Sequence, residues 1–168
     1  MPNVGNIIRS HNKSILEDSH AKSKTKTCNC KNGEDCPMGG NCLEPSIVYG
    51  AAVITPNNVE PYVGISEPPF KSRLYVHNLS FNDRKYSNTE LSKKVWEHKD
   101  RGVDYRIKWR KIQRAIPYSG GGGTCDLCTS EKLHILKTPN TLNSRNEIVS
   151  KCRHTRKFLI FNAANSVT

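Results

Sequence analysis

The chain has 168 residues, 35% of them hydrophobic, and its 26 Lys and Arg against 15 Asp and Glu give a formal net charge of +11. A surplus of this size favours a polyanionic partner over a merely soluble basic surface. No window of about 18 apolar residues occurs and the amino terminus lacks an apolar signal-peptide core, so we expect no membrane partner and a nuclear or cytoplasmic, not secreted, protein.

The first 27 residues are polar and predict a tail or connector. Residues 28–46 are rich in Gly and Asn, which predicts a loop. This loop holds four closely spaced cysteines, namely Cys28, Cys30, Cys36 and Cys42. Because four thiolates are the ligand set of a tetrahedral zinc site, the segment is interpreted as a zinc knuckle.

Two strands are expected next. Residues 47–54 are apolar and rich in β-branched side chains, residues 55–58 carry turn chemistry, and residues 62–65 resume the strand pattern. Together they predict an antiparallel hairpin.

Two helices and a third strand should follow. The Pro-Pro pair at 68–69 suits the start of the first helix. The spacing Ser87-x-x-Glu90 is that of a capping box, which predicts that the second helix begins near Ser87 and ends at Gly102. Residues 103–110 alternate apolar and mostly basic side chains, as a half-buried strand does. The basic face is either solvated or a DNA contact.

The last third of the chain repeats the metal-ligand pattern. Helices are predicted over residues 126–137 and from Ser144 to about Lys151, the second with Ser144-x-x-Glu147 as its capping box. Around them lie three cysteines and a histidine: Cys125, Cys128, Cys152 and His154. Two thiolates on one turn, answered by a C-x-H pair, predict a second zinc site.

These elements predict an α+β fold, with a small, three-stranded, largely antiparallel sheet flanked by helices and two zinc-binding cysteine clusters. The sheet and the second zinc site would form one domain over residues 47–161, followed by a tail at 162–168. Seven cysteines cannot all pair within one chain, so a reducing compartment and structural Zn²⁺ are expected. Zinc binding would add folding free energy that the low apolar content does not supply.

Six side chains lie where a plain core would not need them: Tyr49, Tyr62, Arg73, His77, Glu131 and Asn143. Paired strands would bring the two tyrosines together, and Arg73 and His77, four residues apart, share a helix face. Each has a structural alternative, such as tyrosine packing or a solvated arginine. Glu131 could pair with Lys132, and Asn143 could be a helix N-cap.

The order of these residues resembles the GIY-YIG endonuclease superfamily, above all the endonuclease domain at the C-terminus of reverse transcriptases in Penelope-like retroelements. The two motifs that name the family correspond to Ile-Val-Tyr at 47–49 and Tyr-Val-Gly at 62–64, with Ile47 in place of glycine and valines in place of isoleucine. Three further segments match, at residues 89–96 (Thr-Glu-Leu-Ser, then Val-Trp), 125–132 (Cys-x-Leu-Cys-x-x-Glu-Lys) and 142–154 (Leu-Asn-x-Arg-x-Glu, then Cys-Arg-His). The likeness runs from about Cys28 to Phe161.

The resemblance implies metal-dependent hydrolysis of a DNA phosphodiester, that is, strand nicking. Arg73 would clamp the negative charge of the transition state, and Glu131 would hold Mg²⁺ or Mn²⁺. The polar tail is similar to the connector between polymerase and nuclease in such elements, which implies a reverse transcriptase domain in a longer parent protein.

The remaining roles implied by the resemblance concern protons and positioning. Tyr49 would be the general base or a proton relay, and nearby cations must lower its ordinary pKa of about 10. Tyr62 would order the attacking water. His77 would orient the arginine or share the proton transfer, and Asn143 would fix the metal-bearing helix or touch phosphate.

Two other functions stay open. The first is a catalytically inactive, zinc-stapled DNA-binding module, which the charge and the zinc ligands support equally well. The second is a protein-interaction zinc domain, against which the charge of +11 argues. Only Tyr49, Arg73, Glu131 and Asn143 separate the endonuclease from the DNA-binding module.

Overall fold

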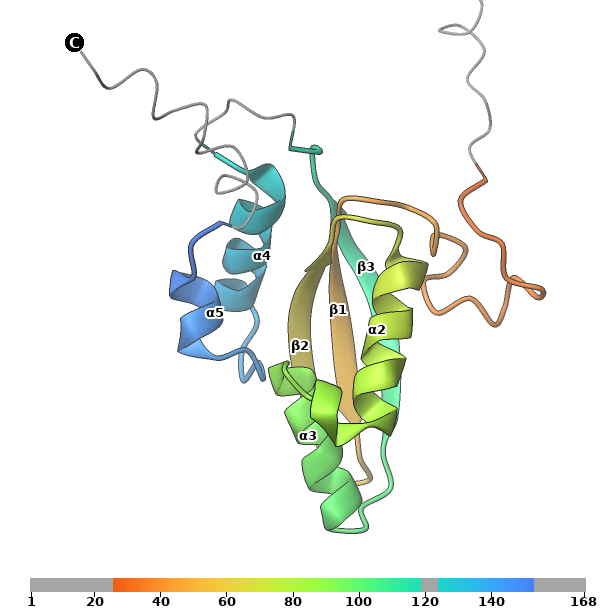
Figure 1. Cartoon of the computed structure of the whole chain (residues 1–168), viewed down its shortest axis with the longest axis vertical. Helices are drawn as coiled ribbons and strands as arrows, with labels where there is room; N and C mark the ends of the chain where they lie inside the picture. Colours follow the sequence, from red (N-terminus) through yellow and green to blue (C-terminus); the bar gives the residue numbers. More distant parts are fainter. Residues whose placement is uncertain (1–25, 119–123, 153–168) are drawn as a thin grey trace, which may run out of the picture.

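The computed structural model describes residues 26–118 and 124–152. Three strands form its sheet, β1 (Ile47–Ile54), β2 (Val59–Ser66) and β3 (Arg106–Arg114). Their order is β2-β1-β3, and β1 is antiparallel to both neighbours (Figure 1). The predicted α+β class with a three-stranded antiparallel sheet is therefore confirmed. The predicted terminal tails lie almost entirely outside the described residues, as does His154.

The apolar run that predicted the first strand of the hairpin is β1, the central strand of the sheet. Six of the eight β1 residues are buried, because helices cover parts of both faces and strands pair with both edges. The turn closes where the Thr55 N–H donates to the Asn58 carbonyl oxygen at 2.9 Å. Strand β2 then begins at Val59, three residues before the predicted start, because its first residues pair with the end of β1.

Five helical segments surround the sheet: α2 (Phe70–Asn82), the 3-10 turn η1 (Arg84–Tyr86), α3 (Glu90–Asp100), α4 (Asp126–Lys137) and α5 (Arg145–Val149). The predicted starts after the Pro-Pro pair and after Ser144 are confirmed; the Ser144 N–H donates to Glu147 Oε2 at 2.8 Å. In the described ranges, none of the helices is long and apolar enough to cross a membrane.

The predicted start of α3 at Ser87 is wrong. Thr89 is the N-cap: its Oγ1 accepts from the Ser92 N–H at 3.2 Å, and its own N–H donates to Ser92 Oγ at 3.1 Å. Ser87 instead ends η1, with its N–H bonded to the Arg84 carbonyl oxygen. The sequence offers Ser87 and Thr89 as possible N-caps, and Ser87 is used to end the 3-10 turn η1.

The third strand also begins later than predicted, at Arg106 instead of residue 103. Arg106 pairs with Ile54, the last residue of β1, so residues 103–105 have no strand partner in this sheet. The strand continues to Arg114, past a bulge opposite Val48 and Tyr49. The alternation of exposed and half-buried residues predicted for this strand is confirmed over its first half.

The two faces of the sheet have separate apolar cores. On one face, Tyr49 and Tyr62 pack with Phe70 of α2 and with α3 residues, and the cysteine loop at 28–46 joins this core through Cys36 and Cys42. On the other, Val48 and Val63 pack against α4. Figure 1 shows α2 and α3 in front of the sheet and α4 with α5 beside β2.

Candidate functional site

The two predicted tyrosines lie on the same face of the sheet. Tyr62 pairs with Ala51, which is two residues from Tyr49, and residues two apart on a strand share a face. Tyr49 is 0% exposed and Tyr62 is 4% exposed. The Tyr49 ring makes edge contacts with Phe70 at 5.1 Å and a tilted contact with Trp109 at 5.9 Å between ring centroids. Its position is thus fixed by aromatic packing.

The hydroxyl of Tyr49 receives two partners from α2. Arg73 Nε donates to it at 3.2 Å, and His77 Nε2 lies 2.7 Å from it. Arg73 and His77 are one helical turn apart, as predicted for residues on a shared helix face. Since the guanidinium can only donate, the Tyr49 oxygen accepts that bond. The Tyr49 O–H donates to His77 Nε2 in the tautomer that carries the ring proton on Nδ1.

The protonation states agree with this arrangement. Burial, helped by the neighbouring Arg73 charge, lowers the pKa of His77 to about 3, so its ring is neutral at pH 7 and is a weak base. Burial also raises the pKa of Tyr49, although Arg73 opposes it, and raises that of Tyr62 well above its ordinary value. The expected net lowering of the Tyr49 pKa by nearby cations is therefore absent, and both hydroxyls are neutral at pH 7.

Glu131 acts on this cluster electrostatically from α4. Its charge raises the pKa values of Tyr49 and Tyr62, though less than burial does. Burial would lower the pKa of Arg73, but the two tyrosines and Glu131 outweigh it and raise the pKa. Glu131 is half-buried, so its carboxylate is accessible in part. Arginine, carboxylate and both tyrosines are thus close enough to influence one another.

A second carboxylate, Glu147 of α5, was missed as a site residue. Its Oε1 lies 3.5 Å from the Tyr62 hydroxyl, and its charge further raises the pKa values of Tyr49 and Tyr62. The sequence identified Glu147 only as a capping residue. Nothing local could reveal a contact between residues 85 positions apart.

Asn143 fastens the outer edge of β2. Its Oδ1 accepts from the Val63 N–H at 2.8 Å, and its Nδ2 donates to the Val63 carbonyl oxygen at 2.8 Å. The remaining amide positions bond to Thr141 Oγ1 and Glu147 Oε2. All four hydrogen-bonding positions are filled, so the amide has none left for phosphate. Ser144, and not Asn143, is the N-cap of α5.

Gly64 lies where the Tyr49 hydroxyl leaves no room for a side chain. A Cβ on Gly64 would lie 2.6 Å from the Tyr49 hydroxyl oxygen and 3.1 Å from Cε1 of Tyr62. The glycine of the Tyr-Val-Gly motif thus leaves the space that the Tyr49 ring and hydroxyl fill. No periodicity in the sequence could predict this close approach across two strands.

We expect Gly64→Ala to lower the free energy of unfolding by about 1–3 kcal/mol or more, because a fixed, buried ring must move. Gly50→Ala, in the central strand β1 of the same sheet, is the control. Its Cβ would meet the flexible side chain of Arg110 at 3.1 Å, which can give way, so it should cost less. Urea unfolding of both variants measures the difference, and equal losses would contradict the assigned role of Gly64.

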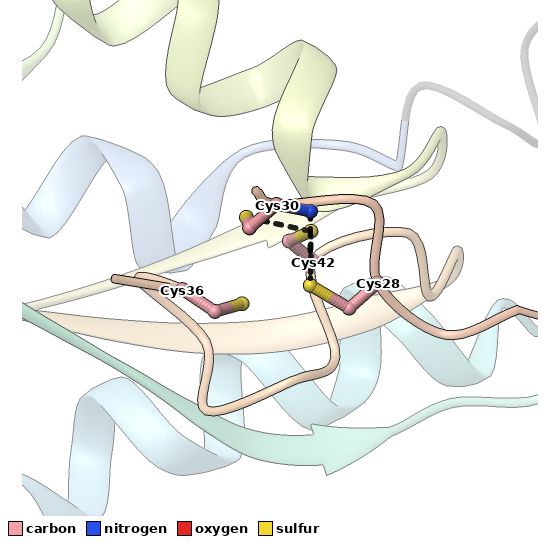
Figure 2. Close-up of side chains that lie close together, drawn as sticks. All are labelled: Cys28, Cys30, Cys36 and Cys42. Atoms are coloured by element: carbon pink, nitrogen blue, oxygen red, sulfur yellow. Dashed lines mark hydrogen bonds between the residues drawn. The ribbon is translucent and has the colours of Figure 1, made fainter. Parts of the chain in front are cut away.

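The first cysteine cluster is preformed. Figure 2 shows the four side chains turned toward one another on the loop before β1. Cys42 Sγ lies 3.6 Å from Cys28 Sγ and 3.7 Å from Cys30 Sγ, and all four sulfurs lie within 4.8 Å of one another. With Zn–S bonds of about 2.3 Å, a tetrahedral zinc site has S–S edges of about 3.8 Å. None of the seven cysteines forms a disulfide, so the cluster could hold zinc.

The close packing of the four thiols shifts their pKa values in different directions. The hydrogen bond with Cys28, together with burial, raises the pKa of Cys30 to about 12. Burial also acts against the thiolate of Cys36, but the backbone N–H groups of Met38 and Gly40 bring its pKa down to about 6. Four thiolates this close repel one another, and a divalent cation would remove that conflict.

The second cluster has three sulfur atoms in the described residues. Cys125, Cys128 and Cys152 lie within 4.8 Å of one another, with 3.3 Å between Cys128 Sγ and Cys152 Sγ. Burial, followed by the neighbouring thiols, raises the pKa of Cys128. These three residues could hold zinc, and the predicted fourth ligand, His154, is not among the described residues.

Purified protein should contain two zinc ions per chain, measured by elemental analysis. Cys42→Ser and Cys128→Ser should each bind one fewer, because each removes a thiolate from one cluster only. Loss of either ion should also lower the thermal unfolding temperature, since metal binding is linked to folding. Well under one zinc per wild-type chain would contradict both sites.

Comparisons with protein-family models, with curated proteins and with solved structures find no match for this chain.

Proposed function

We propose that the protein is a metal-dependent DNA endonuclease that nicks a strand by hydrolysing a phosphodiester bond. One observation carries the proposal: the buried Tyr49 hydroxyl is bonded to both Arg73 and His77, with the charge of Glu131 in reach. A plain core would not need an arginine and a histidine on one tyrosine. The resemblance to the GIY-YIG superfamily supports the same assignment.

In this proposal Tyr49 relays a proton. As the attacking water loses a proton to the Tyr49 oxygen, the tyrosine O–H proton would pass to His77 Nε2, 2.7 Å away. Because a pKa of about 3 makes His77 a weak base, this step needs a water that a bound cation has already acidified. No phenolate has to exist beforehand, which suits a tyrosine with a raised pKa. The water becomes a hydroxide as it attacks phosphorus, and the departing sugar oxygen takes the bonding electron pair.

Arg73 has the second role. Its Nε is bonded to Tyr49 and its side chain is only half-buried, so the terminal nitrogens can face a phosphate. Two such donors would stabilise the extra negative charge on the non-bridging oxygens of the transition state.

The proposed reaction also calls for a hard divalent cation. Glu131 is a half-buried carboxylate whose charge acts on Tyr49, Tyr62 and Arg73. Glu131 would therefore hold Mg²⁺ or Mn²⁺, as carboxylates commonly do. When bound, that cation would polarise the phosphate and neutralise developing charge.

The catalytically inactive DNA-binding module is the second candidate. The burial of Tyr49 and Tyr62, at 0% and 4% exposed, favours it, since a packed tyrosine needs no catalytic task. The net charge of +11 would serve DNA binding alone equally well.

Protonation of His77 should leave a signature in stability. Its pKa is about 3 in the folded protein against 6.5 ordinarily, so the unfolded chain binds more protons between these values. The free energy of unfolding should therefore fall as pH drops below 6.5, by up to about 1.4 kcal/mol per pH unit from this group. His77→Gln should show a shallower loss between pH 7 and 5.5 in urea unfolding. Zinc release affects both proteins, so identical pH profiles would contradict a buried, neutral His77.

Conversion of supercoiled plasmid to the nicked form tests the proposal. Zinc-loaded wild-type protein should nick with added Mg²⁺ or Mn²⁺ and stop when neither is added. Salt-sensitive DNA binding without any metal-dependent nicking would instead support the DNA-binding module.

A further inference from the structure

Three basic side chains of β3 lie on the opposite face of the sheet from the Tyr49 cluster. Arg106, Lys108 and Arg110 pair in register with Ile54, Ala52 and Gly50 of β1. These residues of β1 alternate with Tyr49, Ala51 and Val53, which belong to the core under α2. Because successive side chains of a strand point to opposite faces, the three basic residues face away from that core.

The described elements leave this part of the sheet open. Helix α4 packs over Val48 and Val63, near the start of β1. Further along the same face, Ala52 and Ile54 are only half-buried although they lie on the central strand, and Val59 of β2 is 58% exposed. We name Arg106, Lys108 and Arg110, with the small residues beside them, the basic sheet face.

The glycine at position 50 brings one cation close to the backbone. A Cβ there would lie 3.1 Å from Nε and 3.3 Å from Cγ of Arg110. The arginine side chain therefore lies close to the backbone of β1 at Gly50.

The charges on this face are not neutralised within the described part of the chain, where Arg106, Lys108 and Arg110 form no ion pair. The end of the same strand differs. Lys111 Nζ lies 2.7 Å from Glu44 Oε2, and Arg114 Nε lies 3.7 Å from Glu44 Oε1. Among the described residues, an acidic partner is thus present at one end of β3 and not at the other.

We propose that the basic sheet face is a second DNA-binding surface, which contacts the phosphate backbone of duplex DNA away from the Tyr49 cluster. Its cations repeat every two residues, about 6.7 Å along the strand. On this face the neighbouring residues of β1 and β2 are Gly50, Ala52, Ile54, Val59 and Pro61. None of these five is aromatic, so unpaired bases have no ring to stack on there and backbone contact is favoured. The inference rests on the proposed function only in taking DNA as the partner and needs no cleavage.

Such contacts predict a specific dependence on salt. Each phosphate neutralised on duplex DNA contributes about 0.9 to the slope of log affinity against log salt concentration. Replacing all three cations, in R106Q, K108Q and R110Q combined, should therefore reduce that slope by about 2 to 3. Binding is measured with zinc-loaded full-length protein and a short duplex, without Mg²⁺ or Mn²⁺ so that no strand is cut.

A matched triple variant, K31Q with K85Q and K137Q, removes the same charge from exposed positions elsewhere. It should reduce the slope by less than about one. Equal reductions of the salt slope in both triple variants would overturn the inference. Tighter binding of the wild-type protein to single strands than to the duplex would also overturn it. So would a loss of affinity for phosphatidylserine vesicles, in the β3 triple variant, that equals its loss of affinity for the duplex. If the β3 triple variant does not fold, each single substitution should reduce the slope by about 0.9, and no reduction in any of them would overturn it.

Plasmid nicking keeps the two proposals distinguishable. If the wild-type protein nicks and both triple variants show equal salt slopes, the proposal for the basic sheet face is rejected and the endonuclease proposal is supported. Wild-type protein that never nicks, with the slope lost only in the β3 variant, would do the reverse.

Discussion

Arg73→Ala is expected to slow plasmid nicking by about 100-fold or more, which is typical for loss of a group that stabilises transition-state charge. His77, the other residue bonded to the Tyr49 hydroxyl, is neutral and cannot replace the positive charge of Arg73. DNA binding should change little, since one charge among 26 Lys and Arg is removed.

Arg73→Lys refines this expectation. A lysine keeps the charge but loses the two-donor fork, so it should recover only part of the rate. Lys85→Ala, which removes an exposed charge from η1, is the control and should nick like the wild type. A rate for Arg73→Ala within a few-fold of the control would show that the arginine serves only to pack and bond Tyr49.

Glu131→Ala should abolish metal-dependent nicking and leave DNA binding in place. Removing the carboxylate takes away the ligand for the divalent cation, whereas the basic surface that attracts phosphates is untouched. The exposed Asp104, in the segment between α3 and β3, supplies a control in which the same charge is lost elsewhere. Asp104→Ala should keep the wild-type nicking rate.

Local patterns in the sequence predicted most of the fold. The apolar run of β1, the turn at 55–58 and the capping box at Ser144 each depend on neighbouring residues, and all three appear in the structure. Boundaries set by partners were less accurate. β3 begins where β1 can pair with it, and α3 begins at Thr89 because η1 takes Ser87.

The candidate site divides in the same way. Helix periodicity predicted that Arg73 and His77 share a face, and strand pairing predicted that the two tyrosines lie near each other, on what proves to be one face of the sheet. The roles of Gly64 and Glu147 arise from contacts across the sheet, which no spacing encodes. The direction of the Tyr49 pKa was also beyond the sequence, because it depends on how completely the ring is buried.

Metal-ligand spacing was informative at both clusters. Four cysteines within fifteen residues predicted a common site, and the structure places their sulfurs within 4.8 Å. The family resemblance, by contrast, stays a prediction, because neither the sheet nor the cysteine geometry tests it.

The most direct test of the endonuclease is the ratio of plasmid-nicking rates for wild-type and Glu131→Ala protein, each loaded with zinc and assayed with Mn²⁺. The proposed site predicts metal-dependent nicking by the wild type and none above background by the variant, at matched DNA affinity. Equal rates, whether both proteins nick or neither does, would contradict it.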